Sequence, residues 1–78
     1  MSLVDVRRRL LKLVKELDAA ARDLEKVAGR VEMSGYLYVA DEIMDVKKEL
    51  LDIRLELRRA ADALRHVERE LAGRHEES

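Results

Sequence analysis

Apolar residues recur every three or four positions along most of this chain, in two separate series. The first series runs through the N-terminal half without a gap and consists of Leu3, Val6, Leu10, Leu13, Leu17, Ala20, Leu24, Val27 and Val31. Alternating steps of three and four keep these side chains on one face of an α-helix, as in a heptad repeat. Ser2 precedes the series and has capping-box spacing to Asp5, which favours a helix start at Leu3. We therefore predict a first helix over residues 3–33.

The second series follows the same rule in the C-terminal half. It consists of Tyr36, Val39, Ile43, Val46, Leu50, Ile53, Leu57, Ala60, Leu64, Val67 and Leu71. This spacing predicts a second helix over about residues 36–72. Gly73 can end that helix, because glycine readily adopts the left-handed backbone conformation of a C-terminal cap. We expect residues 73–78 to form a frayed tail.

The two series are out of phase with each other, and the change of phase falls at Ser34 and Gly35. A single helix continuing through Gly35 would carry the first series onto Ser34, Tyr38 and Asp41, none of which continues an apolar face. A turn at residues 34–35 removes this conflict and folds the chain into an α-helical hairpin. In a hairpin centred on Gly35 the two series face each other, and facing residues have numbers that add to about 70.

Gly29 is the alternative end of the first helix. Val31 still follows the apolar series beyond it, and Gly29 falls on the outer face of the helix. A glycine inside a helix costs about 1 kcal/mol relative to alanine, so it can be accommodated there. The pattern favours the turn at Gly35, but the sequence alone does not decide whether the first helix ends at Gly29 or at Gly35.

Each apolar series is wider than one antiparallel neighbour can cover, which predicts self-association. Ordering about seventy residues costs on the order of 100 kcal/mol, so little apolar surface can stay in water. Two hairpins that bury these faces together form an all-α four-helix bundle, and two-fold symmetry is the usual solution for a dimer. The residues expected in this core and interface are Leu10, Leu13, Leu17, Leu24, Val27, Ile43, Leu50, Ile53, Leu57 and Leu64.

Charge is unevenly distributed along the chain. Residues 1–30 carry eight basic and five acidic residues, a net charge of +3, whereas residues 31–56 carry three and seven, a net charge of −4. Antiparallel docking of two hairpins would set the acidic turn end of one near the more basic open end of the other. This complementarity gives antiparallel docking a weak preference, because exposed ion pairs contribute only about 0–1 kcal/mol each. The sequence therefore leaves parallel or antiparallel docking, and a dimer or a higher oligomer, open.

The composition limits the chain to one small domain without disulfide cross-links. It has 78 residues and no proline, cysteine, tryptophan or phenylalanine. Without cysteine there is neither a disulfide framework nor a thiolate metal site, which favours a reducing, cytoplasmic setting. No apolar run approaches the ~20 residues needed to span a bilayer, and no N-terminal segment has the order of a signal peptide.

An acidic stripe is the strongest candidate for chemistry. It consists of Glu42, Asp45, Glu49, Asp52 and Glu56. Carboxylates three residues apart on a helix can share a divalent cation, which makes a metal-dependent enzyme the least favoured of three functional hypotheses. The stripe is expected on the side away from the apolar face, with Lys47, Lys48 and Arg54 nearby. Charge runs of this kind are usually solvated surface, so we expect no metal, no cofactor and no catalysis.

Two other groups of residues are candidate binding sites. Arg7, Arg8 and Arg9 form a short basic run, but the net charge of −1 and the lack of aromatic platforms argue against nucleic-acid binding. His66 and Glu70 have the i, i+4 spacing of metal ligands on a helix, without a third ligand. We expect no nucleic-acid, membrane or small-molecule partner.

The sequence therefore predicts a structural or oligomerisation module, a helical hairpin whose partner is a second copy of itself. The alternative hypothesis is a small natural adaptor or regulator whose wide apolar face binds the helices of another protein. The absence of proline and cysteine fits an engineered or de novo chain. Gly29 and the heavy use of arginine depart from idealised design, and the balance slightly favours an artificial origin.

Overall fold

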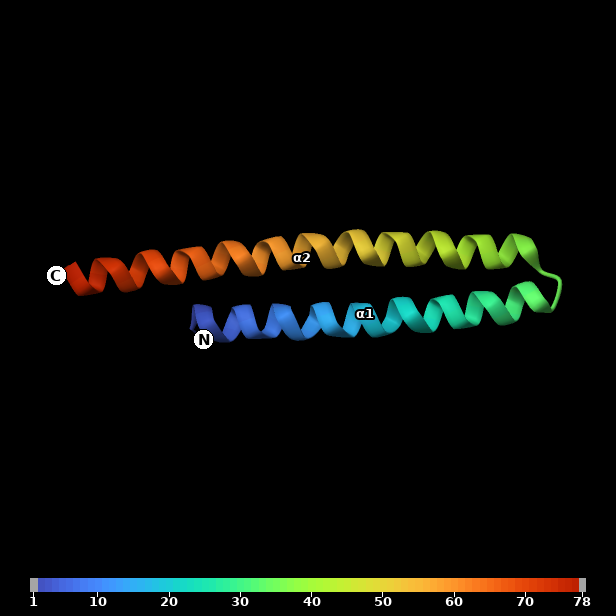
Figure 1. Ribbon diagram of the computed structural model, residues 1–78, viewed down its shortest axis with the longest axis horizontal. Helices are drawn as coiled ribbons and strands as arrows, with labels where there is room; N and C mark the ends of the chain where they lie inside the picture. Colours follow the sequence, from blue (N-terminus) through green and yellow to red (C-terminus); the bar gives the residue numbers. More distant parts are fainter. Residues whose placement is uncertain (1, 78) are drawn as a thin grey trace.

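The computed structural model describes residues 2–77, and their side chains as far as Gly73. It consists of two antiparallel helices, α1 (Leu3–Met33) and α2 (Leu37–Glu77), which pack along each other (Figure 1). The expected all-α helical hairpin is confirmed. The molecule is a rod of 66 × 15 × 13 Å. Both termini lie at one end, where α2 projects past the start of α1 (Figure 1).

Helix α1 begins at the expected residue because Ser2 caps it. The Ser2 hydroxyl accepts a hydrogen bond from the Asp5 backbone N–H at 3.2 Å, and the Ser2 carbonyl accepts one from Val6 at 3.1 Å. These bonds satisfy backbone groups that have no partner within the helix. The Asp5 carboxylate in the first turn adds a favourable interaction with the helix dipole.

The turn between the helices is a Schellman motif built around Gly35. The Gly35 N–H donates to the Glu32 carbonyl at 2.9 Å, and the Tyr36 N–H donates to the Val31 carbonyl at 3.1 Å. This pattern requires a left-handed residue after the C-cap, and Gly35 has a φ of 91°. Gly29 lies inside α1, which settles the alternative that the sequence left open.

The bounds of α2 differ from the expected ones at both ends. The helix begins at Leu37 rather than residue 36, and it continues through Gly73 to Glu77 instead of ending in a frayed tail from residue 73. Gly73 does not act as a left-handed cap, because Gly35 is the only glycine with positive φ in the described chain. Its helical conformation costs only about 1 kcal/mol relative to alanine. Ser78 lies outside the described residues.

The residues that the hairpin buries completely between its two helices form a row of small side chains. Val14, Ala21 and Ala28 of α1 are buried, as are Ala40 and Ala61 of α2. On each helix these positions are multiples of seven residues apart, so they share one face. None of them belongs to the two apolar series.

The two series therefore lie side by side along one flank of the hairpin, whereas the sequence pattern had them facing each other directly. Alanine has no side chain beyond Cβ, so an alanine row allows two helix backbones to approach closely. The longer leucines, isoleucines and valines then remain beside the contact, where a second layer could cover them.

The register of the hairpin is close to the expected one. Three interhelical ion pairs join Arg7 to Glu68, Lys47 to Glu25 and Arg54 to Asp18. Their residue numbers add to 75, 72 and 72, slightly more than the expected 70. Helical side chains lean toward the N-terminus of their own helix. In an antiparallel pair this lean brings side chains into contact whose residue numbers add to slightly more than the numbers of the two backbone positions at the same height.

Candidate functional site

The feature that distinguishes this hairpin is an apolar surface along one side of both helices, which we call the open face. It contains large side chains with substantial exposure, including Leu13 (37%), Val27 (47%) and Ile53 (45%). Val39, Val46, Val67 and Leu71 of α2 are exposed in the same way. Scattered exposed apolar residues are normal on protein surfaces, but a contiguous apolar strip marks an interaction site.

Simple helical geometry explains why both series emerge on the same side. In α1, each of Leu10, Leu17 and Leu24 lies four residues before a buried residue of the contact row. In α2, Leu57 has the same relation to Ala61. The helices are antiparallel and face each other through equivalent rows. Side chains four residues before a contact residue therefore lie on the same side of the hairpin in both helices.

The ten residues expected in the core or interface all belong to this open face. Seven are half-buried in the single chain: Leu10, Leu17, Leu24, Ile43, Leu50, Leu57 and Leu64. The other three, Leu13, Val27 and Ile53, are exposed. None is fully covered by the hairpin alone, so their complete burial depends on something outside the single chain.

Charged side chains of α2 are also part of the contact, because Lys47, Arg54 and Glu68 occupy the same heptad position as Ala40 and Ala61. Two of their three partners on α1 lie on the side away from the open face. Arg54 Nη1 donates to Asp18 Oδ1 at 2.6 Å, and Lys47 Nζ donates to Glu25 Oε2 at 3.1 Å. Near the termini, Arg7 Nε donates to Glu68 Oε2 at 2.7 Å. The apolar pattern did not predict these pairs, although Lys47, Arg54 and Glu68 are spaced by multiples of seven residues, which is a detectable signal.

Among the side chains described as far as Gly73, Asp18 is the carboxyl group whose pKa the fold clearly shifts. The hydrogen bond from Arg54 lowers the pKa of Asp18 below its ordinary value of 3.8, and the charges of Arg54, Arg22 and Arg58 act in the same direction. Partial burial opposes this effect. The ionised form of Asp18 is therefore favoured by the fold.

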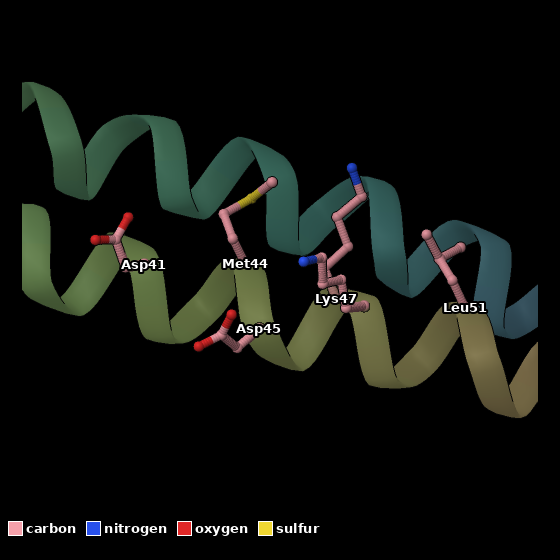
Figure 2. A pocket seen from close by; sticks show the side chains of 6 residues that line it. Asp41, Met44, Asp45, Lys47 and Leu51 are labelled. Atoms are coloured by element: carbon pink, nitrogen blue, oxygen red, sulfur yellow. The ribbon is translucent and has the colours of Figure 1, made fainter.

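A shallow groove of about 550 Å³ lies along α2 on the side of these ion pairs. Its lining residues are Asp41, Met44, Asp45, Lys47, Lys48 and Leu51. Met44 and Leu51 extend from α2 toward α1 (Figure 2). The groove is open to solvent and its charged groups are on the surface, so it lacks the enclosed, converging polar groups of a small-molecule site.

The acidic stripe lies closer to the open face than expected. All five carboxylates are exposed. Glu42, Glu49 and Glu56 each follow an exposed apolar residue of α2 by three positions, so they border the open face rather than lying away from it. Within residues 2–73, no three histidine or acidic side chains converge to hold a metal ion.

The remaining candidate groups are dispersed over the surface. Arg8 and Arg9 are exposed, and Arg7 is engaged by Glu68. His66 Nε2 lies 3.2 Å from Glu70 Oε1 on an exposed stretch of α2.

The two helices contain no apolar stretch long enough to cross a membrane within the part of the chain described. Comparison with protein-family models, curated proteins and solved structures finds no match to this chain. Function is therefore inferred from the physical properties of the open face.

Proposed function

We propose that this chain is a self-association module, in which two hairpins bury their open faces against each other as a homodimeric four-helix bundle. The observation that carries the proposal is the imbalance between the two apolar surfaces of the hairpin. The fully buried contact row holds one valine and four alanines. Both isoleucines and most of the leucines, which have far more apolar area to bury, lie on the open face.

The exposed area of the chain supports a partner of about its own size. The hairpin exposes 6407 Å². A compact monomer of 9.0 kDa exposes only about 4,900 Å² by the scaling of folded proteins, which leaves about 1,500 Å² in excess. Two copies covering this excess would bury about 3,000 Å² in total, which falls in the range of about 2,000–5,000 Å² that obligate homodimers occupy.

A second copy is also a suitable partner in shape. The open face is straight and runs along a rod 66 Å long, so an identical rod can cover it along most of its length. Four-helix bundles pack in this way, with long apolar side chains from facing helices interdigitating in the centre.

Sedimentation equilibrium over a wide range of protein concentration tests the proposal. We expect a mass near twice 9.0 kDa, with dissociation on dilution accompanied by loss of helical circular dichroism. Dissociation and unfolding are coupled because each hairpin has too small a core of its own. A stable helical monomer at all concentrations would contradict the proposal and would leave the open face for helices of a different protein.

A further inference from the structure

We infer that the two copies dock with their turns at the same end, so that α1 of each chain lies beside α2 of the other. This inference rests on the proposed self-association and adds the orientation of the partner. It is carried by the charged residues that border the open face on either side.

Two-fold symmetry allows only two ways to place the open faces of two hairpins together. An axis parallel to the helices keeps both turns at one end and sets α1 beside the partner's α2. An axis perpendicular to the helices, within the interface plane, puts the turns at opposite ends. In that second arrangement α1 lies beside the partner's α1, and α2 lies beside the partner's α2.

The border of the open face on α2 is strongly acidic. The α2 flank, comprising the positions three residues after the exposed apolar residues, includes the charged residues Glu42, Glu49, Glu56 and Glu70. All four are exposed. These four carboxylates give the flank a net charge of −4.

The corresponding border on α1 has mixed charge. The α1 flank at the corresponding positions consists of Arg9, Glu16, Asp23 and Arg30. All of these are exposed as well. Two basic and two acidic residues leave it without net charge.

These flanks distinguish the two arrangements. With the turns at opposite ends, the α2 flank lies beside the α2 flank of the partner, so two acidic surfaces face each other along the bundle. With the turns together, the α2 flank runs along the α1 flank instead. At the register set by the ion pairs of the hairpin, Arg30 comes level with the partner's Glu42.

The α1 flank also brings Glu16 and Asp23 near acidic residues of the partner, so the attraction is partial. The preference arises mainly because the other arrangement sets a flank of −4 against the same flank of the partner. Individual exposed pairs contribute little, but both edges of a symmetric dimer repeat the effect. This orientation is the reverse of the weak preference for antiparallel docking that the net charges of residues 1–30 and 31–56 gave. Those net charges include side chains on the opposite side of the hairpin, which do not border the open face.

A distance between spin labels at the turn tests the orientation. The chain has no cysteine, so Ser34→Cys provides a unique labelling site in an exposed turn. With the turns together, pulsed dipolar spectroscopy should give a separation of about 30 Å or less, the width of a four-helix bundle plus the labels. With the turns at opposite ends the separation should be about 45 Å or more, because α1 has 31 residues.

A label at Lys15→Cys serves as the matched control. Lys15 is exposed near the middle of α1, so both arrangements bring its two copies within about 40 Å. A short distance at Lys15 with a long one at Ser34 would overturn the orientation while leaving the dimer intact. Absence of a dipolar signal at both positions would instead overturn self-association, and the orientation with it.

Discussion

Glycine plays opposite roles at two positions that lie six residues apart. Gly35 has a φ of 91° and allows the Schellman turn to close, whereas Gly29 sits inside α1 in ordinary helical geometry. An added Cβ would meet no atom within 4 Å at either position. Backbone conformation alone therefore separates the two sites.

This contrast predicts opposite effects for the same substitution. Gly35→Ala should lower the free energy of unfolding by about 1–2 kcal/mol, because a left-handed conformation is unfavourable for alanine. Gly29→Ala should raise it by up to about 1 kcal/mol, because alanine is the better helix former. Urea denaturation at one fixed protein concentration measures both. Equal effects of the two substitutions would contradict the turn geometry.

At Asp18 the fold favours the ionised carboxylate, which makes part of the stability dependent on pH. The hydrogen bond from Arg54 lowers the pKa of Asp18 below 3.8 in the folded chain. A carboxyl group with a lowered pKa stabilises the fold above its ordinary pKa, and the contribution is lost as the pH falls through the lowered value. We expect Asp18→Asn to be less stable than the unsubstituted protein near neutral pH.

The difference in unfolding free energy between these two proteins should shrink as the pH is lowered below about 4. Comparing the two chains removes the effect of the other carboxylates, which titrate in both. Urea titrations at a series of pH values provide the measurement. A difference that stays constant down to pH 2 would show that the Arg54–Asp18 pair does not stabilise the fold through its charge.

At the level of the helices, the contact row explains why the hairpin is narrow and why the larger apolar residues remain outside it. Ala21 is 3% exposed and lies against α2, whereas Ala19 lies on the outside of α1. At Ala21 the contact depends on a small side chain, since a larger one there would push the backbones apart.

Ala21→Leu should therefore destabilise the protein by about 1–3 kcal/mol through overpacking. Ala19→Leu adds the same side chain to an exposed position of the same helix and should stay within about 0.5 kcal/mol of the parent. Chemical denaturation of both variants provides the measurement. A neutral Ala21→Leu would mean that the helices separate easily and that the alanine row does not define their spacing.

For the whole molecule, the decisive property is that its two faces differ in what they expose. Ile53 and Leu55 are almost equally exposed in the single chain, at 45% and 46%. They are two residues apart on a helix, so they point to nearly opposite sides. Ile53 lies on the open face and Leu55 on the outer surface.

Lysine substitutions at these two positions test the proposed interface directly. Ile53→Lys should weaken self-association by at least about 100-fold, or ~3 kcal/mol, because each dimer would bury two unpaired ammonium groups. Leu55→Lys should leave the dissociation constant nearly unchanged. Sedimentation of the two variants side by side measures this. Equal dissociation constants would place the interface elsewhere.

Much of the architecture could be predicted from the sequence because it depends on local properties. Heptad spacing, the Ser2 cap and the glycine at the change of phase led to a hairpin with its turn at Ser34 and Gly35. The end of α2 could not be predicted in the same way, because a glycine near a helix terminus is compatible with both a cap and a helical residue.

The sequence by itself determined the two helices, the turn and the presence of more apolar surface than a hairpin can bury. These features follow from periodicity and backbone preference, which act within a few residues. Only the tertiary structure decided which face of each helix meets the other. The apolar series and the alanine row are adjacent on the helix surface, so periodicity alone cannot show which of them makes the contact between the helices. Close backbone packing, together with ion pairs between distant residues such as Arg54 and Asp18, selects the alanine row and leaves the leucines exposed on one side.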